Sequence, residues 1–185
     1  IRHPVKSALE LIIYFDLITI GIAASVKNNY AIILSILTVV ILIALKVFNN
    51  IQKEIPSRLL MIGEGPEKEM AEQLCKELSI DSKVEFLGNS NQVEKNLCHS
   101  DLFLLPSNTE SFGLAALEAM ASKVAVISSN AGGLSEINIH GETGYLTHPD
   151  DIELMSEYAI SILKDPKTLD EFKNKAFKQS KAFDI

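Results

Sequence analysis

From residue 58 onward the sequence alternates between short apolar runs and longer amphipathic segments, and this alternation restricts the fold more than any other feature. Asp101–Leu105 and Val124–Ser128 are nearly continuous in apolar residues, as strands buried on both faces are. Glu67–Leu78 instead carries apolar residues at helical spacing. Strands separated by single helices predict βαβ units, and therefore an α/β fold with a Rossmann-like parallel sheet.

The same patterns give approximate bounds for each element. We predict strands at 58–63, 83–87, 101–105, 124–128 and 144–146. We predict helices at 67–78, 91–99, 112–122, 132–139, 151–164 and 168–182. Parallel sheets bind ligands at the carboxyl ends of their strands. The segments to inspect for a site are therefore the loops after Ile62, Leu87, Leu105 and Ile127.

The first 50 of the 185 residues differ from the rest in charge and hydropathy. They carry four basic and two acidic groups, although the whole chain has a net charge of −7. Two apolar runs, Ala8–Ser25 and Tyr30–Leu45, flank a short polar turn. This pattern predicts two parts: an apolar helical hairpin over residues 1–46, and a separate Rossmann-like domain over residues 47–185.

The apolar runs have two interpretations. The second run approaches the length that spans a bilayer, which would give the chain a membrane contact through residues 8–48. Asp16 would then lie within the membrane at a cost of about 2.5–3.5 kcal/mol. Alternatively, the runs are buried parts of a soluble assembly, and their Ile, Val and Thr content would also suit strands.

Composition excludes several classes of protein. The acidic balance argues against nucleic-acid binding, which usually needs a basic excess. Cys75 and Cys98 form no CxxC pair and have no His at ligand spacing, so we expect no disulfide framework and no metal site. We find no signal-peptide pattern at the N-terminus and expect a cytoplasmic protein, membrane-associated if the hairpin enters a bilayer.

The loop after Leu105 is the strongest candidate site. It is polar and leads into a helix whose first backbone N–H groups, from Phe112, Gly113 and Leu114, would form an anion site suited to phosphate. Glu110 lies beside that site and Glu118 lies two turns further along. The alternative is that Glu110 caps the helix and Glu118 is a solvated helical residue.

Two further loops contain glycines. Gly132 and Gly133 follow the strand that ends at Ser128 and form a second possible phosphate cradle. Gly63 and Gly65 follow the first strand of the body, where they are equally consistent with a plain strand-to-helix turn. Neither pattern is specific by itself.

Together these segments resemble the retaining glycosyltransferases of family 4. Glu110-Ser-Phe-Gly-Leu-Ala-Ala-Leu-Glu118 has the E-x7-E form of that family. The segments 63–66, 84–88, 101–107, 130–136 and 140–146 follow in the family's order. The resemblance covers residues 47–185 and implies the C-terminal half of a GT-B glycosyltransferase.

The resemblance also implies roles for individual residues. Glu110, the candidate catalytic residue, would contact the sugar hydroxyls, and Glu118 would contact the ribose. The amides of Phe112–Leu114 would hold the diphosphate and sugar, while Gly88 and its neighbours would line the base pocket. The remaining donor-binding candidates are Gly63, Gly65 and Ser111. The resemblance implies no cofactor and no metal, only a UDP-sugar as substrate.

Segments 47–57 and 103–121 most resemble the branch that transfers N-acetylglucosamine from UDP to L-malate in bacillithiol biosynthesis. One alternative is another family 4 hexosyltransferase with a glycan or lipid acceptor. A second is a non-catalytic nucleotide-binding or membrane-anchored module. The family's N-terminal acceptor domain, and the Arg and Lys that clamp the diphosphate, are not matched. We therefore expect this chain alone to be inactive.

Overall fold

The computed structural model describes the backbone of residues 9–14 and 30–183, and the side chains of residues 38–183. Its strands are β1 (Leu9–Tyr14), β2 (Ser57–Ile62), β3 (Val84–Gly88), β4 (Leu102–Leu105), β5 (Ala125–Ser129) and β6 (Gly144–Thr147). Its α-helices are α2 (Tyr30–Glu54), α3 (Lys68–Glu77), α4 (Val93–His99), α5 (Leu114–Ala121), α6 (Leu134–Ile137), α7 (Ile152–Lys164) and α8 (Pro166–Ser180). Single 3-10 turns, η1 (Asp81–Lys83) and η2 (Lys181–Phe183), complete the described elements.

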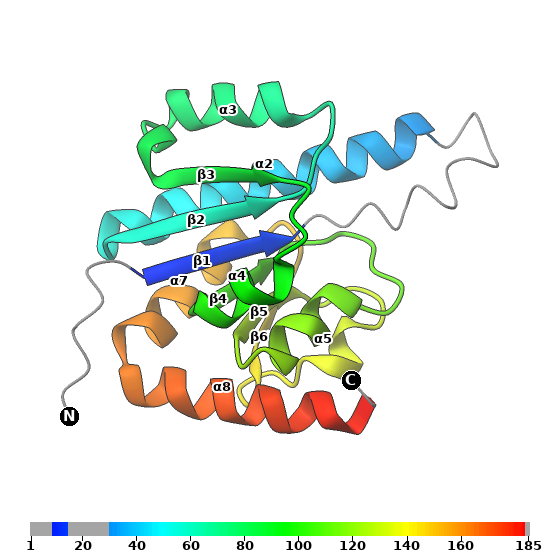
Figure 1. Cartoon of the computed structure of the whole chain (residues 1–185), viewed down its shortest axis with the longest axis vertical. Coiled ribbons are helices and arrows are strands. Elements are labelled where there is room, and N and C mark those ends of the chain that lie inside the picture. Colours follow the sequence, from blue (N-terminus) through cyan, green and yellow to red (C-terminus); the bar gives the residue numbers. More distant parts are fainter. Residues whose placement is uncertain (1–8, 15–29, 184–185) are drawn as a thin grey trace.

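The strands form one parallel sheet in the order β3-β2-β1-β4-β5-β6 (Figure 1). This is the order of a doubly wound Rossmann sheet, in which the chain reverses its direction of travel across the sheet between β1 and β4. The predicted parallel α/β fold is therefore confirmed.

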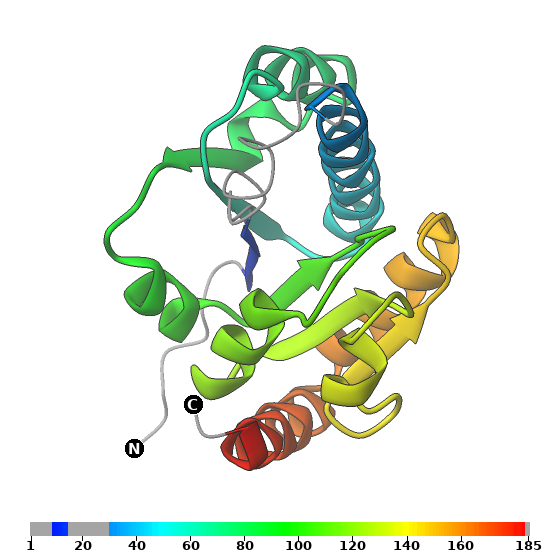
Figure 2. The ribbon, with the colours of Figure 1, turned by 90° about the vertical axis from the view of Figure 1, so that its right-hand side faces the viewer.

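Helices cover both faces of this sheet (Figure 2). Leu59 and Met61 of β2 point to one face, where they join a core with α2, α3 and α7. Leu60 and Ile62 point to the other, which is covered by α4, α5 and α6. Helix α8 contributes to both cores. The strands are apolar on both sides because both sides are buried.

The prediction of a helix over the first apolar run is wrong for residues 9–14, which form strand β1. This strand lies at the centre of the sheet and pairs with β2 along its whole length, from Leu9 opposite Ser57 to Tyr14 opposite Ile62. A central parallel strand reads as an uninterrupted apolar run, so periodicity cannot separate it from a helix. Residues 1–8 and 15–29, which include the predicted turn, lie outside the described residues.

The second apolar run is a helix, as predicted, but α2 continues to Glu54 and passes through residues 46 and 47 without a break. Leu45, Val47, Phe48 and Ile51 are fully buried in the core beneath the sheet. Among the residues the structure describes, no helix combines the length and the apolar character needed to cross a membrane.

Helices α8 and α5 begin at residues other than the predicted ones for identifiable local reasons. Helix α8 begins at Pro166, because Asp165 caps it by accepting hydrogen bonds from the Lys167 N–H and the Thr168 hydroxyl. Helix α5 begins at Leu114, two residues later than predicted, because Gly113 takes a left-handed conformation with φ of 80°. Phe112 and Gly113 therefore belong to the loop before α5.

Candidate functional site

The loop that joins β4 to α5 lies at the carboxyl end of β4, next to the point where the sheet order reverses. Doubly wound sheets bind ligands at this place because the loops on either side diverge and leave a crevice. The predicted residues Glu110, Ser111, Phe112, Gly113 and Leu114 all lie in this loop or begin the helix after it.

The Glu110 carboxylate is bonded within this loop. Its Oε1 accepts a hydrogen bond of 3.1 Å from the backbone N–H of Gly113. The first hydrogen bond within α5 runs from the Leu117 N–H to the Gly113 carbonyl, so the N–H groups of the first turn precede it. The carboxylate is thus held beside the positive end of the helix dipole.

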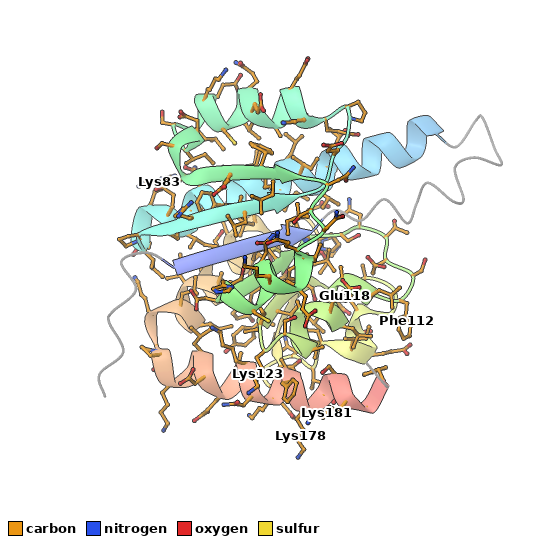
Figure 3. The ribbon with its side chains drawn as sticks, viewed as in Figure 1. Lys83, Phe112, Glu118, Lys123, Lys178 and Lys181 are labelled. Atoms are coloured by element: carbon orange, nitrogen blue, oxygen red, sulfur yellow. The ribbon has the colours of Figure 1, made fainter. Side chains whose placement is uncertain are left out.

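The residues around Glu110 form an exposed rim. Phe112 is 46% exposed and Leu114 is 43% exposed, and the Phe112 ring meets Phe183 edge-on. Glu118 is also exposed and lies one turn after Leu114, on the same side of α5. Phe112 and Glu118 can both be followed in Figure 3. Large apolar groups exposed together commonly mark a binding surface.

The glycine pair after β5 supports this loop. A Cβ on Gly132 would lie 1.6 Å from the Glu110 carbonyl oxygen, and one on Gly133 would lie 2.9 Å from the Ser111 carbonyl oxygen. The Gly133 N–H also donates to the Glu110 carbonyl at 3.3 Å. These glycines therefore let two backbones pack against each other. Their role as a second phosphate cradle stays a prediction.

The other glycine candidates lie on the opposite side of β1 from the Glu110 loop, at the carboxyl ends of β2 and β3. The Gly63 N–H donates to the Gly88 carbonyl at 2.9 Å, and Gly88 has a φ of 62°. The Asn89 side chain donates to Glu64 at 3.2 Å, which ties the same two loops together. Gly63, Gly65 and Gly88 thus form a second group at the carboxyl edge, separate from the Glu110 loop.

Glu67 is a buried residue beside this second group that the sequence patterns did not single out. It is 5% exposed, and neither carboxylate oxygen has a hydrogen-bond partner in the structure described. It lines a cavity of about 30 Å³ with Ile41, Met61 and Phe86. Its only signal in the sequence is its place directly after Gly65 and Pro66, at the start of α3.

Comparison with known proteins gives the family. Residues 40–179 match the model of glycosyl transferases group 1. The N-acetyl-alpha-D-glucosaminyl L-malate synthase of Bacillus anthracis is 45% identical over 118 residues, which are 64% of this chain and 31% of that protein. The 2-deoxystreptamine N-acetyl-D-glucosaminyltransferase of Niallia circulans is 33% identical over 123 residues, 63% of this chain and 32% of that protein. The chain thus spans about a third of the length of these relatives.

Solved structures agree on the fold. The Anabaena Alr3699/HepE structure in complex with UDP and glucose superposes with a TM-score of 0.74 at 18% identity, over 95% of this chain and 44% of that one. The C-terminal domain of the group 1 glycosyl transferase LpcC from Francisella tularensis has a TM-score of 0.73 at 24% identity, over 94% of this chain and 85% of that one. The described sheet is that of a GT-B glycosyltransferase, and the chain belongs to the glycosyl transferases group 1 family.

Proposed function

We propose that this chain is the donor-binding part of a retaining glycosyltransferase that takes N-acetylglucosamine from UDP-N-acetylglucosamine. The observation that carries the proposal is the Glu110–Glu118 segment, which places a carboxylate, a left-handed glycine and the start of α5 together at the switch point of the sheet. A helix start offers N–H donors and a positive dipole end to a diphosphate.

Two relatives favour an N-acetylglucosaminyl donor, since both are named for transfer of that sugar although their acceptors differ. Support for the nucleotide is independent: the Anabaena neighbour of the same fold was solved with UDP. L-malate is the proposed acceptor because the relative at 45% identity is named for it. The second relative makes an aminocyclitol the alternative acceptor.

The proposed roles are those that the family resemblance implies, and the loop is placed so that its residues can fill them. Glu110 binds hydroxyl groups of the donor sugar, which requires its carboxylate to turn from, or share, its bond to the Gly113 N–H. Glu118, one turn after Leu114 on the exposed side of α5, binds the ribose. Ser111, Phe112 and Leu114 border the diphosphate and sugar, while Gly63, Gly65 and Gly88 lie on the side of the base.

The proposed reaction proceeds with retention at the anomeric carbon. The bond from that carbon to the diphosphate oxygen breaks, and a bond to the malate hydroxyl oxygen forms on the same face. The hydroxyl proton passes to the departing diphosphate, so no metal or cofactor is required. The malate would be held by a part of the enzyme outside this chain, and the chain alone would not turn over.

Calorimetry with UDP-N-acetylglucosamine tests the donor site. The chain should bind it, and Glu110→Gln and Glu118→Gln should each weaken binding by about tenfold, as losing a hydrogen bond to a charged group does. Glu153→Gln, an exposed carboxylate on α7, is the control and should leave affinity unchanged. Binding that is absent in the unaltered chain would refute the proposed donor site.

A product assay tests the proposal that the acceptor is held by a part of the enzyme outside this chain. The chain is incubated with UDP-N-acetylglucosamine and L-malate, and products are measured by mass spectrometry. Absence of glycosylated malate is expected, with donor binding retained. Turnover by the chain alone would contradict the proposal that the acceptor is held elsewhere.

A further inference from the structure

We infer that Asn138 is a positioning residue for the Glu110 loop. It anchors a segment, Gly132–Asn138, that we call the brace, and the brace supports the backbone on which Glu110 is carried. The role given to Glu110 rests on the proposed function, whereas the mechanical link between Asn138 and the loop does not.

Asn138 is completely buried and joins three elements through its side chain. Its amide nitrogen lies 3.2 Å from the Val126 carbonyl and 3.0 Å from the Ser128 hydroxyl of β5, and 3.1 Å from the Tyr145 carbonyl of β6. Its amide oxygen accepts a hydrogen bond of 2.9 Å from the Thr143 hydroxyl. Asn138 thus fixes the end of the brace to two neighbouring strands.

The other end of the brace touches the Glu110 loop. The Gly133 N–H donates to the Glu110 carbonyl, and Gly132 packs directly on that same carbonyl. A Cβ added to Gly113 would lie 2.8 Å from a methyl carbon of Leu134 and 3.2 Å from one of Ile137, so both side chains pack closely against Gly113. The brace therefore contacts both residues of the Glu110–Gly113 hydrogen bond.

The short helix inside the brace explains why an anchor is needed. Helix α6 has only four residues, which is too short to be stable without tertiary contacts. Leu134 and Ile137 are buried against the loop on one side, but apolar packing by itself does not fix the rotation or register of one helical turn. The hydrogen bonds of Asn138 set that position relative to β5 and β6.

An amide matches this environment because it both donates and accepts. Its nitrogen faces the two strand carbonyls, and its oxygen accepts from the Thr143 hydroxyl. Asn138→Asp keeps the size but points a carboxylate at two carbonyl oxygens, and Asn138→Ala leaves those groups unpaired. Both changes should release the brace while leaving the rest of the sheet paired.

Amide hydrogen exchange of the whole chain, followed by NMR, tests the mechanical link. Asn138→Ala should accelerate exchange of the Gly113 and Gly133 amides by about tenfold or more, with exchange in α7 unchanged. Ser156→Ala is the matched control: it also removes a buried polar side chain, whose hydroxyl donates to the Ile152 carbonyl and accepts from Asn50, at a position in α7 outside the brace. Equal acceleration in both variants, or none at Gly113 and Gly133, would overturn the inference.

A double-mutant cycle on donor binding tests the link to Glu110. Asn138→Ala alone should weaken UDP-N-acetylglucosamine binding by several-fold while changing UDP binding less, because the sugar contact is what Glu110 supplies. In a Glu110→Ala background the same change should have little further effect. Additive losses would show that Asn138 acts on stability in general and would overturn the positioning role. If the unaltered chain binds no donor, the proposed function fails, and the exchange experiment still decides the mechanical link.

Discussion

The side chain of Glu110 reaches forward three residues to accept a hydrogen bond from the Gly113 N–H, and Gly113 can take the required left-handed conformation because it has no side chain. The Glu110–Gly113 pair holds the carboxylate at the start of α5, and the loop after β5 packs against both residues. The pair has consequences for stability that can be measured apart from any ligand.

Gly113→Ala is expected to destabilise the chain by about 2–4 kcal/mol, combining the left-handed backbone penalty with a steric clash. The new Cβ would lie 2.8 Å from a Leu134 methyl group. Gly141→Ala separates the two effects, because Gly141 has φ of 78° and no atom of the described residues lies within 4 Å of an added Cβ. It should cost only about 1–2 kcal/mol in urea denaturation. Equal losses would mean that Leu134 and Ile137 move freely.

The ion pair between Lys173 and Asp101 is expected to matter more than an exposed pair of the same length. Both it and the Arg58–Glu85 pair have a nitrogen–oxygen distance of 2.9 Å, but the Asp101 side chain is 7% exposed and that of Glu85 is 51% exposed. Asp101→Asn should lower the free energy of unfolding by about 1–3 kcal/mol. Glu85→Gln, the matched control, should lower it by less than about 1 kcal/mol. The reverse order would contradict the role of burial.

Replacing Glu67 with an apolar residue is expected to stabilise the chain. Its two carboxylate oxygens are buried without a hydrogen-bond partner in the described structure, beside the apolar side chains of Ile41 and Met61. Glu67→Met should raise the free energy of unfolding by about 1 kcal/mol or more, measured by thermal and urea denaturation. Glu69→Met, which removes an exposed acid from the first turn of α3, should instead cost about 0.5 kcal/mol. Destabilisation by Glu67→Met would indicate that the carboxylate has a stabilising contact.

The two cysteines are expected to differ in reactivity. Burial raises the pKa of the Cys75 thiol to about 11, and the negative charges of Asp81 and Glu72 add to the effect. Cys98 is exposed. At pH 8 a thiol reagent should therefore modify Cys98 rapidly and Cys75 only after denaturation, because the thiolate is the reactive form. Cys98→Ser should abolish the fast reaction, and a fast phase that survives would contradict the assignment.

The same thiol gives a pH dependence of stability. The folded state raises the pKa of Cys75 above its ordinary value of 9.0, so the folded chain retains the proton more strongly than the unfolded chain. Its contribution to stability is present below pH 9 and is lost as the pH rises towards 11. Denaturation of the unaltered chain and Cys75→Ala across this range should show a difference that shrinks with pH.

The strands and helices of the body could be predicted because their periods differ and Gly or Pro separates them. The first apolar run could not be assigned in the same way, since an isolated run such as Leu9–Tyr14 fits a helix, a membrane segment or a central strand equally well. Only pairing with β2 and β4, which are distant in the sequence, decides its structure.

The candidate site likewise has features that the local sequence predicts and features that it does not. The Glu110 loop was predictable from local chemistry, because a strand, a polar loop and a helix start are adjacent in the sequence. The packing role of Gly132 and the anchoring role of Asn138 depend on contacts between segments: Gly132 packs on Glu110, and Asn138 bonds to Val126. The late start of α5 follows from the backbone of Gly113, which a helical pattern does not reveal.

The central position of β1 has a practical consequence for shortened versions of this protein. A version that begins at Val47, where the sequence motifs shared with the family begin, would lack the strand that lies between β2 and β4. The sheet would fall into a pair and a trio of strands, each with an apolar edge whose backbone groups have lost their partners. Such edges join readily with those of other molecules, so truncation at this position should yield aggregates, and soluble material should require residues 9–14.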